Sequence, residues 1–95
     1  STLNKLGVKS LKRVKANLTT RCNEPLYSSF HIDYPNITTA ILYLNTNNGY
    51  TEFKSGEKVN SVGNRIVVFD SNLKHRTVTC TDQKTRIVIN FNYEI

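Results

Sequence analysis

Apolar and polar residues alternate in short runs along the chain from about residue 12 onward. This period of two predicts β-strands, because successive side chains of a strand point to opposite faces. Clusters of Asn, Gly, Asp and Ser separate the runs, and these residue types favour turns. The pattern predicts eight strands, at residues 12–20, 27–33, 38–45, 50–54, 58–62, 65–69, 76–81 and 85–93.

Eight short strands in 95 residues predict one all-β domain, a jelly roll or barrel in which two sheets close over a pocket. A chain of this length has room for a site but not for a second domain. We therefore expect residues 1–95 to form a single domain. Residues 1–11 form a basic N-terminal segment, either a short tail or the remainder of a longer chain.

Two of the predicted strands, 38–45 and 85–93, each have one apolar face and one mixed face. Tyr43 and Arg86 lie on the mixed faces. If these side chains point into the pocket, the apolar faces point outward. The outward residues are Ala40, Leu42, Leu44, Ile87, Ile89 and Phe91. A chain this short hardly supplies a cover for them, so we expect upstream helices or a homo-oligomer to bury this surface.

Basic residues outnumber acidic ones by 13 to 7, which gives a net charge of +6. Five of them lie within the first fifteen positions: Lys5, Lys9, Lys12, Arg13 and Lys15. Such a cluster attracts anionic partners, including nucleic acids. The segment has no interleaved aromatic residues of the kind that stack on bases, so we favour a solvated basic face and expect no nucleic-acid partner.

The two cysteines, Cys22 and Cys80, are too few for a disulfide framework. No secretory signal is visible, and no apolar run approaches the length of a membrane span. We expect two free thiols in an intracellular, cytoplasmic protein that does not contact a membrane.

The sequence FHIDY, residues 30–34, holds a histidine and an aspartate two positions apart. On a strand, His31 and Asp33 would share one face and could reach the same ion, although most H-x-D triplets are solvated side chains without a metal. The other histidine of the chain, His75, follows Asp33 by 42 residues. Two His and one carboxylate on one side of an ion form the facial triad of non-haem Fe(II) oxygenases.

Arg86 follows His75 by eleven residues and sits in an otherwise apolar run. A guanidinium fixes a carboxylate through paired, charge-assisted hydrogen bonds. Its apolar surroundings disfavour the alternative, an arginine in a surface ion pair. We therefore expect Arg86 to bind an acidic ligand in the pocket.

These residues resemble the Fe(II)- and 2-oxoglutarate-dependent dioxygenases, specifically the prolyl-4-hydroxylase-like branch. The similarity covers roughly residues 12–93. His31, Asp33, His75 and Arg86 match the spacing of its H-x-D, H and R. AILYLNT (40–46) looks like the strand that follows H-x-D, GYTEF (49–53) resembles its G-G-x-L-x-F hairpin, and VNSVGNRIVVFDSNLKHR (59–76) resembles the segment that leads to the second His.

The resemblance implies a double-stranded β-helix that uses Fe(II), 2-oxoglutarate and O2 to hydroxylate a substrate, with release of succinate and CO2. It implies that His31, Asp33 and His75 are the metal ligands and catalytic residues. Arg86 and Tyr43 would bind the distal carboxylate of 2-oxoglutarate. The prime substrate is open: a peptidyl-prolyl or other peptidyl side chain is favoured, with free amino acids and small metabolites close behind.

The chain also departs from the family pattern. Tyr50 replaces the second Gly of the hairpin, and Ser61 replaces the usual Pro. The family often has a tyrosine before H-x-D that contacts the cosubstrate. The candidates for that contact in this chain are Tyr27 and, on the preceding strand, Asn17. Asn92 stands where nucleic-acid dealkylases have a second Arg, which disfavours that activity.

Two other classes of function remain open. One is a non-catalytic β-jelly-roll module that binds sugar or nucleic acid. In such a module the spacing of His31, Asp33, His75 and Arg86 would be a coincidence. The other is a cupin-like metal-dependent isomerase, although cupin sites usually draw on more than the two histidines present here.

Overall fold

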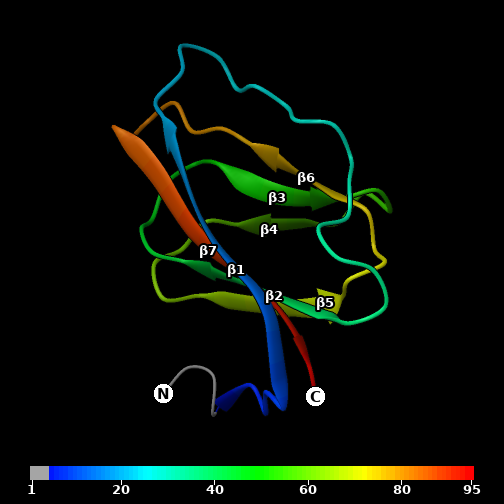
Figure 1. The fold of residues 1–95 in the computed structure, drawn as a ribbon. Coiled ribbons are helices and arrows are strands. Elements are labelled where there is room, and N and C mark those ends of the chain that lie inside the picture. Colours follow the sequence, from blue (N-terminus) through cyan, green and yellow to red (C-terminus); the bar gives the residue numbers. More distant parts are fainter. Residues whose placement is uncertain (1–4) are drawn as a thin grey trace.

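The computed structural model describes residues 5–95 and contains seven strands in two antiparallel sheets (Figure 1). The strands are β1 (Ser10–Thr20), β2 (Thr38–Tyr43), β3 (Tyr50–Phe53), β4 (Lys58–Asn60), β5 (Ile66–Asp70), β6 (His75–Val78) and β7 (Thr85–Glu94). The predicted jelly-roll class is confirmed. Among the described residues, no helix is long and apolar enough to cross a membrane.

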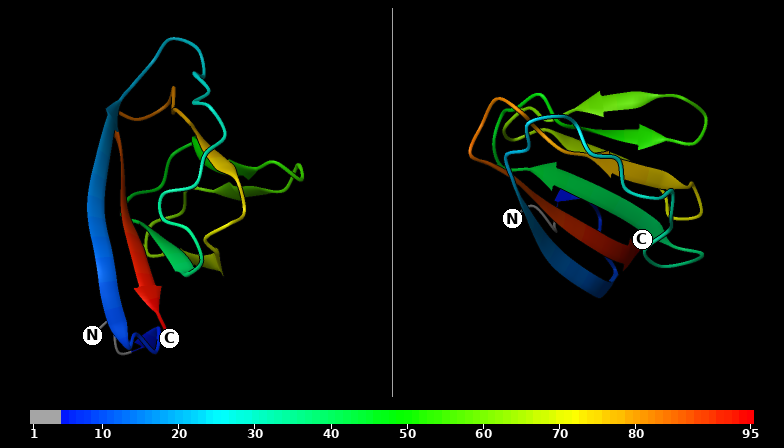
Figure 2. Two further views of the ribbon diagram at one scale, coloured as in Figure 1. Left: turned by 45° about the vertical axis from the view of Figure 1, so that its right-hand side comes forward. Right: turned by 90° about the horizontal axis from the view of Figure 1, so that it is seen from above.

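The larger sheet has the strand order β1-β7-β2-β5 and the smaller one the order β4-β3-β6. The two sheets face each other, and the segment between β1 and β2 runs along one open side of the sandwich (Figure 2). β1 is an edge strand that pairs only with β7, over almost its whole length. β7 therefore lies between β1 and β2, with its mixed face turned toward the smaller sheet.

The strand predicted at 27–33 is absent, so the prediction of eight strands was too high by one. The segment touches β6 at two isolated bridges, Tyr27 with Val78 and His31 with His75. Between the bridges, Ser28 and Ser29 are solvent-exposed, and Ser28 bonds β6 through its backbone amide and its Oγ, which accepts from the amide of Thr77 at 2.9 Å. The segment therefore follows β6 as an extended loop, which still places its His and Asp beside that strand.

Two apolar clusters lie on opposite faces of the larger sheet. Ile41, Tyr43 and Val88 face the smaller sheet, and they contact Val59 of β4 and the neighbouring Val67 and Phe69 of β5. On the other face, Ala40, Phe91 and Tyr93 pack with Leu6, Val8, Leu42 and Ile89. Leu6 and Val8, just before β1, thus cover one end of the outward apolar surface for which the sequence predicted no cover.

The rest of the outward face remains exposed. In register along the sheet, Val14 of β1 pairs with Phe91, and Leu18 with Ile87. Val14 and Leu18 are 50% and 62% exposed. Leu44, Ile66 and Val68 extend the same surface and are also exposed. The expectation of an uncovered apolar face therefore holds for this end of the sheet.

Candidate metal and anion site

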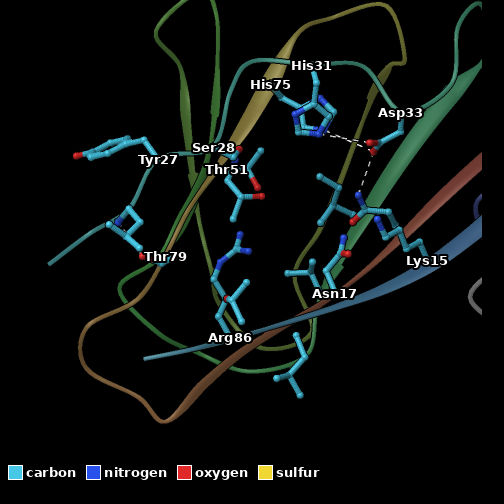
Figure 3. Close-up of a pocket in the computed structure, with 17 residues that line it drawn as sticks. Lys15, Asn17, Tyr27, Ser28, His31, Asp33, Thr51, His75, Thr79 and Arg86 are labelled. Atoms are coloured by element: carbon cyan, nitrogen blue, oxygen red, sulfur yellow. Dashed lines mark hydrogen bonds and ion pairs between the residues drawn. The ribbon is translucent and has the colours of Figure 1, made fainter. Parts of the chain in front are cut away.

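A cavity of about 450 Å³ lies between the two sheets (Figure 3). Its walls come from the inner faces of both sheets, from β1 and from the loop before β2. The polar residues that line it are Lys15, Asn17, Thr19, Ser28, His31, Asp33, Thr51, His75, Thr77, Thr79, Arg86 and Asn90. The sequence-predicted His31, Asp33, His75 and Arg86 thus meet in one cavity.

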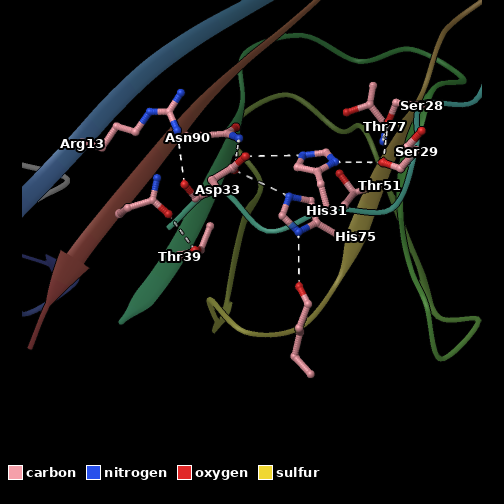
Figure 4. A network of polar contacts seen from close by, with 12 residues as sticks. Arg13, Ser28, Ser29, His31, Asp33, Thr39, Thr51, His75, Thr77 and Asn90 are labelled. Atoms are coloured by element: carbon pink, nitrogen blue, oxygen red, sulfur yellow. Dashed lines mark hydrogen bonds and ion pairs between the residues drawn. The ribbon is translucent and has the colours of Figure 1, made fainter. Parts of the chain in front are cut away.

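The two histidines are held side by side by the backbone. The amide of His31 donates to the carbonyl of His75 at 2.9 Å, and the amide of His75 donates back at 3.0 Å. Residues opposed in this way point to the same side, and the ring centroids lie 4.7 Å apart (Figure 4). His75 is buried and also packs edge-on against Phe69. The loop-borne His31 thereby takes its position from β6.

The hydrogen bonds of the rings define which nitrogen is free. Nδ1 of His31 lies 2.9 Å from the carbonyl oxygen of Ser29, and Nδ1 of His75 lies 3.3 Å from that of Leu73. A carbonyl only accepts, so each Nδ1 carries the proton and donates it. The Nε2 atoms have no carbonyl partner and face Asp33. Metal-binding histidines are commonly fixed in this way, with one nitrogen bonded to the protein and the other free for the ion.

Asp33 completes the group. Its Oδ1 lies 3.4 Å from Nε2 of His31, and its Oδ2 lies 3.7 Å from Nε2 of His75. The nearby His75 ring is the main influence that lowers the pKa of Asp33 to about 2. Partial burial opposes this effect, while the amide of Asn90, which donates to Oδ2 at 3.1 Å, lowers the pKa further. The carboxylate is therefore ionised at neutral pH.

These three side chains fit a divalent metal ion. One ligand atom from each of His31, Asp33 and His75 can be chosen so that all lie within 4.8 Å of one another. Two donors bound to one ion at about 2.0–2.2 Å lie roughly 3–3.5 Å apart, close to the Nε2–carboxylate distances seen here. Nε2 of His75 is also buried without a hydrogen-bond partner among the described residues. A buried ring nitrogen that faces a carboxylate without a hydrogen-bond partner is a position that an ion between the two groups would satisfy.

Arg86 enters the same cavity from β7 (Figure 3). Its side chain is only 2% exposed, and its Nε donates to Oγ of Ser61 at 3.1 Å. Within residues 5–95, no Asp or Glu lies within ion-pair distance of it. Burial lowers the pKa of Arg86, which shows the cost of its desolvation. A buried guanidinium without a counter-ion is a ready site for an anionic ligand.

Tyr43 lies against Arg86 rather than beside the metal ligands. The guanidinium carbon of Arg86 is 5.8 Å from the centre of the Tyr43 ring, within the range of a cation–π contact. The buried Tyr43 hydroxyl donates to Oγ1 of Thr51 at 2.7 Å, and burial raises its pKa. Thr51 itself lines the cavity. A ligand beside Arg86 therefore meets Thr51, with Tyr43 supporting both.

Sequence reasoning missed several polar residues of the cavity. Asn90, which holds Asp33, shares the mixed face of the last strand with Arg86, so its parity was a usable signal. Thr51 and Thr77 carry no motif, and only the pairing of β3 with β6 brings them together. The choice between Tyr27 and Asn17 is not decided by the fold, because both line the cavity.

No protein-family model and no curated protein matches the sequence. Solved structures do match the fold. A cupin protein from Bacteroides fragilis aligns over 97% of this chain and 72% of its own, with a TM-score of 0.65 and 12% identity. A cupin domain from Bordetella pertussis aligns over 88% and 84%, with a TM-score of 0.59 and 12% identity. The chain has the cupin fold.

A prolyl-4-hydroxylase from Pseudomonas putida has the same fold. It aligns over 97% of this chain with a TM-score of 0.58 and 18% identity, and this chain spans 57% of its length. Identities this low establish a common fold and leave function to the side chains of the site. The fold brings His31, Asp33 and His75 together in the cavity of a cupin-type jelly roll.

Proposed function

We propose that the protein is an Fe(II)- and 2-oxoglutarate-dependent oxygenase that hydroxylates a second substrate. The observation that carries the proposal is the position of Arg86, a buried guanidinium without an acidic partner in the described chain, in the same cavity as His31, Asp33 and His75. A metal site alone does not need such a cation. A dicarboxylic cosubstrate that binds the metal at one end needs it at the other.

In this proposal the donor set selects the metal. Two imidazoles and one carboxylate leave positions open for ligands, as in non-haem Fe(II) oxygenases. The chain would hold the ion through Nε2 of His31, Nε2 of His75 and the carboxylate of Asp33. When bound, the ion supplies the redox chemistry, and the protein supplies binding, orientation and a shaped cavity.

The other end of the cavity would hold 2-oxoglutarate by its distal carboxylate. Arg86 neutralises that carboxylate, and Thr51, backed by the Tyr43 hydroxyl, adds a neutral hydrogen bond. The side chains of Ile41 and Val88 would form an apolar wall between the metal end and the arginine end of the cavity and exclude water there. The overall reaction takes a C–H group, 2-oxoglutarate and O2 to the hydroxylated product, succinate and CO2.

The prolyl-4-hydroxylase neighbour supports a peptide or amino-acid side chain as the prime substrate. A second candidate is a cupin-like metal-dependent isomerase, which would use the metal group without a cosubstrate, and the cupin neighbours share the fold that it requires. The two candidates share His31, Asp33 and His75 and differ over Arg86. An experiment on the arginine therefore separates them.

The metal is tested first. Anaerobic titration of the metal-free protein should show one Fe(II) per chain, and His31→Gln should abolish stoichiometric binding. Zn(II) or Ni(II) carried through purification would compete, because both rank above Fe(II) in affinity. Undiminished binding in His31→Gln would remove the triad and the proposal with it.

The cosubstrate is tested by the charge-transfer absorption that anaerobic Fe(II) protein should develop with 2-oxoglutarate. Losing the charged partner of a buried carboxylate costs about 2–5 kcal/mol, which is a loss of affinity of roughly thirtyfold to several thousandfold. Arg86→Gln should therefore lose the band while keeping Fe(II). Arg21→Gln, at an exposed arginine, is the matched control and should behave as wild type. If Arg86→Gln develops the band at the wild-type concentration, the cosubstrate assignment fails.

A further inference from the structure

One side of the cavity carries a lysine that the proposed chemistry does not use. Lys15 lies on the edge strand β1 and lines the cavity. It pairs in register with Asn90, whose amide donates to Asp33, so its side chain is on the inner face beside the metal group. Figure 3 shows Lys15 on the same side of the cavity as Asp33, and Arg86 rising from β7.

The ammonium of Lys15 has no acidic partner in the described part of the chain. Lys12, three residues earlier, pairs with Glu94 at 3.5 Å, and Arg76 pairs with Glu52. Asp33 is the one acidic residue that lines the cavity, and no ion pair joins it to Lys15. Lys15 is solvent-exposed, as expected of a residue at the rim.

A second unpartnered group lies on the same strand face. Oγ1 of Thr19 is buried, lines the cavity and has no hydrogen-bond partner among the described residues. Buried hydroxyls are normally bonded, and an orphan at a cavity wall marks a place where a ligand can complete the bond. The inner face of β1 thus presents a free cation opposite Asn90 and, four residues further along, a free hydroxyl opposite Arg86.

Charge balance indicates what would use them, and this step rests on the proposed function. A divalent ion, the Asp33 carboxylate, the Arg86 guanidinium and doubly charged 2-oxoglutarate sum to zero. Lys15 is then the remaining charge of the cavity. The guanidinium of Arg13, which donates to the backbone carbonyl of Asp33 at 3.3 Å, adds to the positive potential on that side.

We propose that the prime substrate carries a carboxylate, which binds Lys15 at the β1 side of the cavity, beside Asn90 and Asp33. The carboxylate belongs either to a free acid, such as the α-carboxylate of an amino acid, or to an acidic residue of a peptide. Both sources offer the same chemistry to the lysine.

Binding to a loaded but inactive protein tests this. Zn(II) is redox-inert, so protein with Zn(II) and saturating 2-oxoglutarate holds both groups without turnover. Two matched probe pairs are titrated while backbone amide NMR shifts are followed: N-acetyl-L-proline against N-acetyl-L-prolinamide, and N-acetyl-prolyl-glutamate amide against its glutamine counterpart. The first pair represents the free acid and the second the acidic peptide.

In at least one pair, the carboxylate should bind about tenfold more tightly than its amide, as expected for one charge-assisted hydrogen bond. The preference should shrink as salt is raised. It should be lost in Lys15→Gln, retained in Lys15→Arg, and unchanged in Lys12→Gln, which removes the same charge from the same strand outside the cavity.

The proposal fails if neither carboxylate is preferred, or if the preference survives in Lys15→Gln. It also fails if Lys15→Gln weakens 2-oxoglutarate instead, because Lys15 would then belong to the cosubstrate. Zn(II) and 2-oxoglutarate binding are measured beforehand without the probes. A failure at that stage overturns the proposed function, and the same titration on metal-free protein then decides whether Lys15 selects carboxylates.

Discussion

His31 and His75 exchange both backbone hydrogen bonds, N–H to O at 2.9 and 3.0 Å, although no strand runs through His31. This single bridge brings a loop histidine beside a strand histidine and leaves both Nε2 atoms facing Asp33. The site therefore depends on how firmly the loop is held against β6. Backbone hydrogen bonds to β6 hold it, and side-chain contacts of Arg76 add to them.

Arg76, adjacent to His75, provides the main contact of this kind. Its Nε donates to Glu52 at 2.6 Å, and its guanidinium carbon lies 4.8 Å from the Tyr27 ring and 4.5 Å from the Phe30 ring. Both aromatic residues belong to the loop that carries His31. We infer that Arg76 positions the metal ligands through this loop without touching the cavity.

Arg76→Gln should therefore loosen the loop and weaken Zn(II) binding by about tenfold, on the scale of a partly desolvated cation–π contact of 1–2 kcal/mol. Amide hydrogen exchange at His31 should accelerate, while exchange in β7 stays unchanged. Arg65→Gln, which removes a guanidinium bonded to the Asn60 carbonyl outside the loop, is the control. Equal Zn(II) affinity in both variants would contradict a positioning role for Arg76.

The metal-free protein should lose stability on acidification between about pH 4 and pH 2 through Asp33. Its pKa is lowered from 3.8 to about 2 in the folded chain. The unfolded chain therefore takes up the proton first, so the contribution is present above pH 4 and is lost as the pH falls toward 2.

The size of this contribution is at most about 2 kcal/mol. Asp33→Asn should lower the free energy of unfolding at neutral pH and flatten its dependence on pH in that window. Chemical denaturation at a series of pH values, with a chelator present, measures both. Glu24→Gln, at an exposed acid, should keep the wild-type slope. If Asp33→Asn leaves the pH dependence of the unfolding free energy unchanged, the contacts of Asp33 do not stabilise its ionised carboxylate.

The bare end of the larger sheet should mediate association. Leu18, Leu44 and Val68 are 62%, 44% and 49% exposed on one continuous apolar face. Apolar patches of this kind usually mark an interface. We expect sedimentation at micromolar concentration to show species larger than 10.8 kDa, and Leu18→Lys to shift them toward the monomer. A monomeric wild type that binds little hydrophobic dye would contradict this prediction.

Much of the architecture could be predicted because its causes are local. Alternation of apolar and polar residues places seven strands, and the parity of the last one puts Arg86 and Asn90 on its inner face. The extended loop at 27–33 has the same alternation, but whether it becomes a strand depends on how continuously its backbone pairs with β6, which it meets at two isolated bridges. Alternation within one segment does not contain that information.

The residues that hold the site in place could not be predicted from the sequence for a related reason. Ser61 contacts Arg86 across 25 residues, and Thr51 meets Tyr43 only after β3 folds over the larger sheet. Small hydroxyl residues carry no spacing signal, so they are identified only by their contacts. Leu6 and Val8 likewise cover the Phe91 end of the sheet from a segment that the sequence indicates only as basic.

Gly49 shows how closely this support is packed. A Cβ atom at this position would lie 2.7 Å from Cδ of Arg86, 2.7 Å from the carbonyl oxygen of Val78 and 2.8 Å from Oδ1 of Asn47. The carbonyl belongs to β6 and cannot withdraw without disturbing the sheet. Only glycine therefore lets the chain pass behind Arg86 while the guanidinium keeps its place in the cavity.

Gly49→Ala should consequently destabilise the fold by about 1–3 kcal/mol, the usual cost of overpacking, and should displace Arg86. Gly63→Ala is the control, since a Cβ there meets nothing closer than 3.5 Å. Thermal unfolding measures the first effect. At a temperature where Gly49→Ala is still folded and still binds Fe(II), its affinity for 2-oxoglutarate should be at least about tenfold lower than in Gly63→Ala, because a displaced guanidinium forfeits a charge-assisted bond. Normal affinity in the folded Gly49→Ala protein would mean that the position of Arg86 does not determine cosubstrate binding.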